Sequence, residues 1–126
     1  MNAKYDLEER LLDYAAQVIR LVDQLPATRA GNHVAGQLLR SGTSPLPNHG
    51  EAQAAESRRD FIHKLKISLK ELKESRWWLR LIQQVPLMDT ERVEPLVGET
   101  QELIRIFATS IRTAERNQRT PRGGSG

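Results

Sequence analysis

Apolar residues recur along most of the chain at alternating steps of four and three, the spacing of helices that bury one face. The clearest stretch runs from Ser57 to Gln84 without Gly or Pro, which predicts one helix of roughly 40 Å at ~1.5 Å per residue. Ser57 and Asp60 mark its start, because their S-x-x-[DE] spacing is that of a capping box. Its inward seam consists of Phe61, Leu65, Ser68, Leu72, Ser75, Leu79 and Ile82.

The same spacing predicts helices over residues 4–25 and 90–116. Pro26 ends the first, because it lacks an amide hydrogen and restricts the residue before it. Pro95 falls near the start of the last, where a missing N–H costs little. Residues 117–126 contain no apolar side chain, and we expect a disordered tail there.

The segment between the first two long helical patterns has two interpretations. Gly42, Pro45, Pro47 and Gly50 fall close together, which suits either a short helix and loop or one longer helix kinked near Pro45. We favour a kinked helix over residues 29–55, because residues 51–56 (EAQAAE) are strong helix formers. With residues 58–84 as the third helix, residues 1–116 form an all-α domain, an antiparallel up-down-up-down four-helix bundle.

The outward side of the predicted helix 58–84 is both basic and apolar. Arg59, Lys66, Lys73 and Arg80 repeat every seven residues, while Trp77 lies outside the core seam. A tryptophan among cations suits stacking on an unpaired base beside phosphate contacts. Burial of Ile67, Trp77 and Leu81 against another subunit competes with that interpretation, and three outward apolar groups favour it. Nearby acidic side chains also dilute the positive field.

Composition narrows the function classes. The 126 residues include no cysteine, which excludes disulfides, cysteine-based zinc sites and thiol nucleophiles. No apolar run is long enough to cross a bilayer and the N-terminus lacks a signal-peptide core, so we expect a cytoplasmic protein with no membrane partner. The net charge of +3 is too small to indicate nucleic-acid binding by itself.

No recognised catalytic or cofactor motif occurs. The Walker, Rossmann and nucleophile-elbow patterns are missing from the sequence. Asp60-x-x-His63 is a single near-match to the paired Glu-x-x-His pattern of di-iron bundles, which is an incomplete ligand set. We therefore expect no enzyme activity, no metal and no cofactor.

An arginine-containing segment, residues 37–41 (QLLRS), precedes an Asn-x-x-Glu turn at residues 48–52 (NHGEA) and the helix start at residues 57–72 (SRRDFIHKLKISLKEL). In this order the three segments resemble the four-helix bundle family of 23S rRNA intervening-sequence proteins, which is also similar to accessory proteins of diversity-generating retroelements. The sequence departs from the family pattern at Gly42, Pro45, Leu46 and Pro47. We interpret Asn48 and Glu51 as structural residues that hydrogen-bond the backbone at a bend.

The resemblance implies a bacterial, ring-forming homo-oligomer, commonly a homopentamer, that binds RNA or other nucleic acid and has no catalytic residues. A protein-interaction scaffold without a nucleic-acid role is the alternative, and either version admits a protein partner. The candidate nucleic-acid-binding residues are Arg40, Arg58, Arg59, Lys66, Lys70, Lys73 and Arg80. The candidate subunit contacts are Ile67, Trp77 and Leu81, and the structural motif residues are Asn48, Glu51, Ser57 and Asp60.

Overall fold

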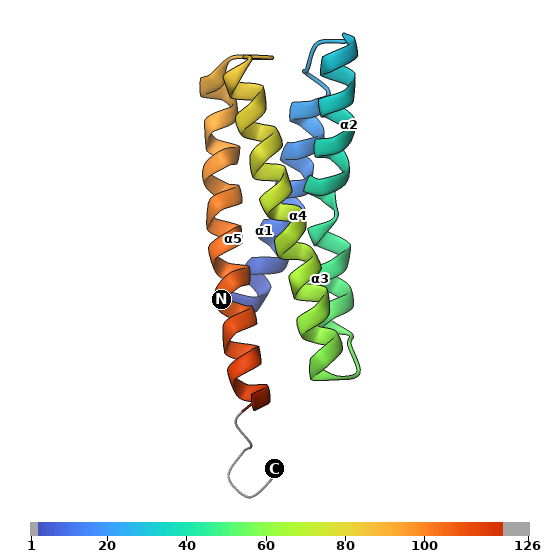
Figure 1. The fold of residues 1–126 in the computed structure, drawn as a ribbon, viewed down its shortest axis with the longest axis vertical. Coiled ribbons are helices and arrows are strands. Elements are labelled where there is room, and N and C mark those ends of the chain that lie inside the picture. The colour runs from blue at the N-terminus through green and yellow to red at the C-terminus, as the bar shows by residue number, and fades with distance from the viewer. Residues whose placement is uncertain (1–2, 120–126) are drawn as a thin grey trace, which may run out of the picture.

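The protein is built from helices packed side by side (Figure 1). The computed structural model describes residues 3–119, and within that range it contains no strand. The helices are α1 (Ala3–Val22), α2 (Arg29–Thr43), α3 (Pro45–Gln53), α4 (Arg58–Gln84) and α5 (Thr90–Arg119). The α1–α2 loop and the α4–α5 turn lie at one end of the molecule, and the α3–α4 loop lies at the other (Figure 1).

Helix α4 confirms the expected seam. Six of the seven seam residues are buried and Phe61 is half-buried. Ser57 has extended backbone angles, and its side-chain oxygen accepts a hydrogen bond from the Asp60 amide at 3.1 Å, which satisfies one donor of the first turn. The helix begins and ends where its sequence predicts.

The C-terminal ends of α1 and α5 differ from the predicted ones. Helix α1 ends at Val22, because the chain tightens before Pro26 through bonds from the Gln24 and Leu25 amides to carbonyls three residues back. Helix α5 continues to Arg119, so residues 117–119 are helical rather than part of a tail, since Gln and Arg favour helix. The rest of the predicted tail, residues 120–126, lies outside the described residues.

The predicted helix over residues 29–55 is divided into α2 and α3 at Ser44. The Ser44 backbone is itself helical, at φ −62° and ψ −38°, and its amide donates to the Arg40 carbonyl. Pro45 follows as the first residue of α3, where its missing amide hydrogen is tolerated. The Asn48 side-chain amide donates to the Ser44 carbonyl at 3.0 Å and to the Ser44 hydroxyl at 2.9 Å. Asn48 thereby satisfies polar groups at the junction.

Small polar side chains interrupt the apolar core. The Thr100 hydroxyl donates to the Leu96 carbonyl, so the buried Tyr14 phenol donates to Thr100 at 2.7 Å. Ser75 likewise donates to the Glu71 carbonyl and accepts from Ser41 at 2.8 Å. These bonds join α1 to α5 and α2 to α4, and each satisfies a group that would be costly to bury alone.

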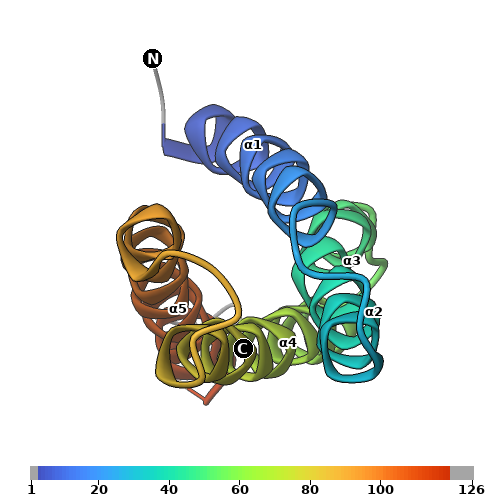
Figure 2. The same cartoon turned by 90° about the horizontal axis from the view of Figure 1, so that it is seen from above.

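Helix α1 lies close to α2 on one side and faces α5 on the other (Figure 2). The close approach depends on Gly42, because a Cβ atom there would lie 2.7 Å from a methyl carbon of Val18. Within the described residues, no helix is long and apolar enough to cross a membrane.

Candidate nucleic-acid interface

The outer face of α4 carries the exposed basic side chains that its sequence predicts. Because the buried seam occupies the opposite side, Arg59, Lys66, Lys73 and Arg80 all face solvent, and Lys70 joins them. This face consists of one rigid helix rather than loops. It presents cations along several helical turns.

Trp77 is the most exposed large apolar side chain on this face, at 61%. The guanidinium carbons of Arg76 and Arg80 lie 5.9 Å and 5.5 Å from the centre of its ring system, within cation–π range. Leu81 and Val85 continue the exposed apolar row at steps of four, and we call Trp77, Leu81 and Val85 the Trp77 strip. Ile67, the third predicted contact residue, is half-buried.

Two of the candidate cations are already paired with carboxylates. The Arg40 guanidinium contacts both Glu71, at 2.6 Å, and Glu74. Lys66 lies 2.9 Å from Glu115 of α5. Sequence spacing could not reveal either partner, because both pairs join different helices. These two positive charges are therefore partly offset within the protein.

The other candidates differ from these two. Arg58, Arg59, Lys70 and Lys73 are exposed, and none has a side-chain hydrogen bond or ion pair with another described residue. Arg59 also lines an open cavity of about 490 Å³ between α4 and α5, together with Ile62, His63, Lys66, Glu115 and Gln118. Arg80 contacts the Trp77 ring but no carboxylate within residues 3–119. The free positive charge on the α4 face therefore lies at Arg59, Lys70, Lys73 and Arg80.

Three basic residues of α5 were missed by the sequence interpretation. Arg105, Arg112 and Arg116 are exposed and follow one another at steps of seven and four. That spacing was the available signal, and it matches the spacing used for α4. Arg105 contacts Glu102, and Arg112 donates to the Thr109 hydroxyl at 3.2 Å.

The motif residues at α3 and the start of α4 have structural contacts. Glu51 lies 2.6 Å from Lys64 and so joins α3 to α4, whereas Asn48 binds the Ser44 backbone as described above. Among the described residues, no three or more His, Asp or Glu side chains lie close enough together to hold a metal ion, so Asp60 and His63 are not part of such a group.

The chain is similar to a known protein family and to a solved structure. Residues 4–109 match a family model described as 23S rRNA-intervening sequence protein. A crystal structure of a protein of unknown function from the S23 ribosomal protein family of Bacteroides thetaiotaomicron is similar, with a TM-score of 0.78 and 33% identity. That similarity covers 82% of this chain and 96% of the other. No curated protein matches the chain. The similarity to retroelement accessory proteins stays a prediction.

Proposed function

The chain belongs to the 23S rRNA-intervening sequence protein family, and from that premise we propose a non-enzymatic helical bundle that binds nucleic acid, which we take to be RNA, through the outer face of α4. The observation that carries the proposal is the exposed Trp77 ring with two arginines close to it, one to two turns from the unpaired Lys70 and Lys73. The family name adds the connection to ribosomal RNA.

The chemistry of this face suits an unpaired stretch of RNA. An indole ring offers a flat surface on which a base of any kind stacks, and neighbouring cations meet the phosphates. The Arg76 and Arg80 guanidinium groups lie within about 6 Å of the ring centre, so positive charge stands next to a base that stacks on Trp77. Because Arg40 and Lys66 are paired, we place the site toward the C-terminal half of α4.

The assembly and helix directions form part of the same proposal. We infer a ring of copies, a pentamer by family resemblance, with the helices antiparallel and α2–α3 acting as one bent rod. A ring repeats a weak basic surface, so simultaneous contacts with one RNA raise its overall affinity without new contacts per subunit. Leu81 and Val85 are also exposed and are not needed for base stacking, so they support contact between copies while Trp77 stays free to bind RNA.

RNA affinity at two salt concentrations tests the nucleic-acid role. The variant Lys70→Glu/Lys73→Glu/Arg80→Glu reverses three charges on the α4 face. We expect its affinity for a labelled single-stranded RNA to fall by at least about 100-fold at low salt, with a shallower salt dependence than that of the wild type. Fluorescence anisotropy gives both quantities.

A matched variant separates this face from total charge. Arg105→Glu/Arg112→Glu/Arg116→Glu makes the same change in net charge on α5, and we expect it to retain most of the affinity. Equal losses in the two variants would show that binding follows net charge rather than the α4 face. Undiminished affinity in the α4 variant contradicts the proposal.

The alternative function, a protein scaffold with no nucleic-acid role, rests on the Trp77 strip. If the strip joins copies of the chain, Trp77→Ala lowers the mass measured by light scattering and leaves the helical circular dichroism unchanged. Leu39→Ala removes another exposed apolar side chain and serves as the control. A wild-type mass with weakened RNA binding assigns Trp77 to base stacking, whereas a lower mass with no RNA binding by the wild-type protein favours the scaffold.

A further inference from the structure

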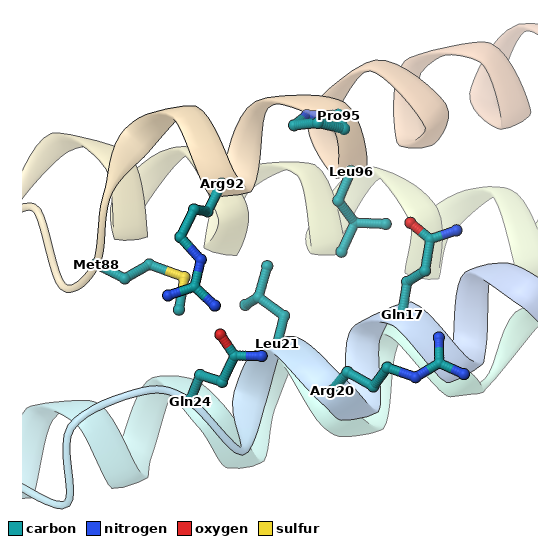
Figure 3. Close-up of a pocket in the computed structure, with 8 residues that line it drawn as sticks. All are labelled: Gln17, Arg20, Leu21, Gln24, Met88, Arg92, Pro95 and Leu96. Carbon is teal, nitrogen blue, oxygen red and sulfur yellow. The ribbon is translucent and has the colours of Figure 1, made fainter.

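A pocket lies between α1 and α5, away from the outer face of α4 (Figure 3). The two helices are held together by the Arg10–Glu99 ion pair, with nitrogen–oxygen distances of 2.8 Å and 3.0 Å, and by the buried Tyr14–Thr100 hydrogen bond. Farther along both helices, toward the α1–α2 loop, a cavity of about 180 Å³ opens between them.

The floor of this pocket is apolar. Leu21 of α1 and Leu96 of α5 extend toward one another in Figure 3 and are 8% and 3% exposed. Met88 and Pro95 complete the apolar lining. A cavity of ~150 Å³ with an apolar lining is large enough for a benzene-sized group. The volume therefore suits the apolar part of a small organic molecule, although this pocket is open to solvent on one side.

The rim of the pocket is polar and carries two positive charges. Arg20, Gln17 and Gln24 come from α1, and Arg92 comes from α5. Figure 3 shows the Arg92 and Gln24 side chains directed toward each other across the opening. None of the four side chains has a hydrogen bond or ion pair with a described residue. By contrast, Arg10 and Arg40 pair with carboxylates of neighbouring helices.

Acidic side chains occur on the same helices but leave the two guanidinium groups unpaired. Asp23 follows Arg20 by three residues, and Glu91 directly precedes Arg92. Both carboxylates are exposed, and neither forms an ion pair with Arg20 or Arg92. Figure 3 shows the Arg92 guanidinium at the opening beside Gln24, whereas the Arg20 guanidinium extends the other way, toward Gln17. A guanidinium fork beside an apolar floor is complementary to an oxygen anion attached to an apolar body, since arginine binds carboxylates through paired N–H groups.

We propose that this pocket binds a small organic carboxylate whose apolar part is about the size of a benzene ring. The carboxylate meets Arg92, the Gln24 amide adds a hydrogen bond, and the ring contacts Leu21, Leu96 and Met88. Arg20 adds positive charge at the other end of the rim. This site is separate from the proposed RNA surface and does not depend on it. A ligand of this size gives an affinity of about millimolar strength.

Methionine provides a local probe of the pocket. The chain has two methionines, Met1 and Met88, so protein labelled with ¹³C at the methionine methyl groups gives two methyl signals. We expect benzoate to shift the Met88 signal saturably. Benzyl alcohol keeps the ring but lacks the charge, and we expect its binding to be at least about tenfold weaker. Benzylammonium, with the opposite charge, should produce no saturable shift.

Two variants identify the charges that recognise the anion. Arg92→Gln and Arg20→Gln change exposed side chains. We expect Arg92→Gln to weaken benzoate binding by about tenfold and Arg20→Gln, which removes a more distant charge, to weaken it by about twofold. Arg112→Gln, on α5 outside the pocket, should leave the affinity unchanged. The proposal is overturned if benzoate leaves the Met88 signal unmoved, if benzyl alcohol binds equally well, or if both pocket variants bind benzoate as the wild type does.

Discussion

Helix α1 is held differently by its two neighbours. Toward α2 it approaches closely enough that Gly42 has no room for a Cβ atom beside Val18. Toward α5 it is held by an ion pair and a buried hydroxyl pair, and the adjoining part of the contact opens into the pocket at Leu21 and Leu96. One side is apolar and close-packed, whereas the other is polar and partly open.

This difference separates two ways of positioning a helix. Close apolar contact depends on shape, because protein interiors leave little room for an added methyl group. Polar contact depends on pairing, because burying a hydroxyl without a partner destabilises the fold by more free energy than one hydrogen bond contributes. A polar contact also tolerates a nearby gap. We therefore expect substitutions on the α2 side to act mainly through sterics and those on the α5 side through hydrogen bonding.

The largest expected effect is at the α1–α2 contact. In Gly42→Ala the new methyl group meets Val18, whose β-branched side chain has little rotameric freedom. The exposed Gly36 lies on the same helix and has open space around it, so Gly36→Ala gains helix propensity without a clash. We expect Gly42→Ala to be less stable than Gly36→Ala by roughly 1–3 kcal/mol.

Urea denaturation of both variants measures this difference. Gly36→Ala should exceed the wild type by about 0.5–1 kcal/mol in the free energy of unfolding. Equal stabilities for the two alanine variants would show that α1 can move away from α2 at no cost in free energy. The α1–α2 contact would then not depend on the absence of a side chain at Gly42.

A smaller effect is expected at the α1–α5 contact. Tyr14→Phe removes the hydrogen bond to Thr100, while Thr100 keeps its bond to the Leu96 carbonyl. We expect a loss of about 1 kcal/mol in the free energy of unfolding at neutral pH, measured by the same denaturation. An unchanged stability would show that apolar packing alone maintains this contact.

The same variant predicts a distinct pH dependence. Burial raises the pKa of Tyr14 from 10.0 to about 12. The folded state therefore retains this proton when the unfolded state has lost it. The free energy of unfolding is therefore unaffected by Tyr14 ionisation below pH 10, and it falls as the pH rises from 10 toward about 12.

The free energy of unfolding falls by roughly 2–3 kcal/mol over this range. Tyr14→Phe does not show this fall, because phenylalanine has no ionisable group. The wild type should therefore be the more stable protein at pH 7, and this advantage should disappear or reverse near pH 12. Parallel stability curves for the two proteins across this range would contradict burial as the cause.

The spacing of apolar residues within each helix was enough to predict much of the architecture. The α4 seam at Leu65, Leu72 and Leu79 was predictable because helical spacing alone places those residues on one side. The same spacing predicted exposed Lys73 and Trp77. It could not predict that Arg40 pairs with Glu71, because that pairing depends on how α2 lies against α4.

The sequence by itself determined the helices, their buried faces and the absence of cysteine chemistry, because these follow from spacing and residue type within a few turns. Only the tertiary structure decided which charges are paired, where α1 approaches α2 at Gly42, and that Arg20 and Arg92 share a pocket with Leu21 and Leu96. Those features join residues distant in sequence, so they depend on the relative placement of helices, which local periodicity leaves open.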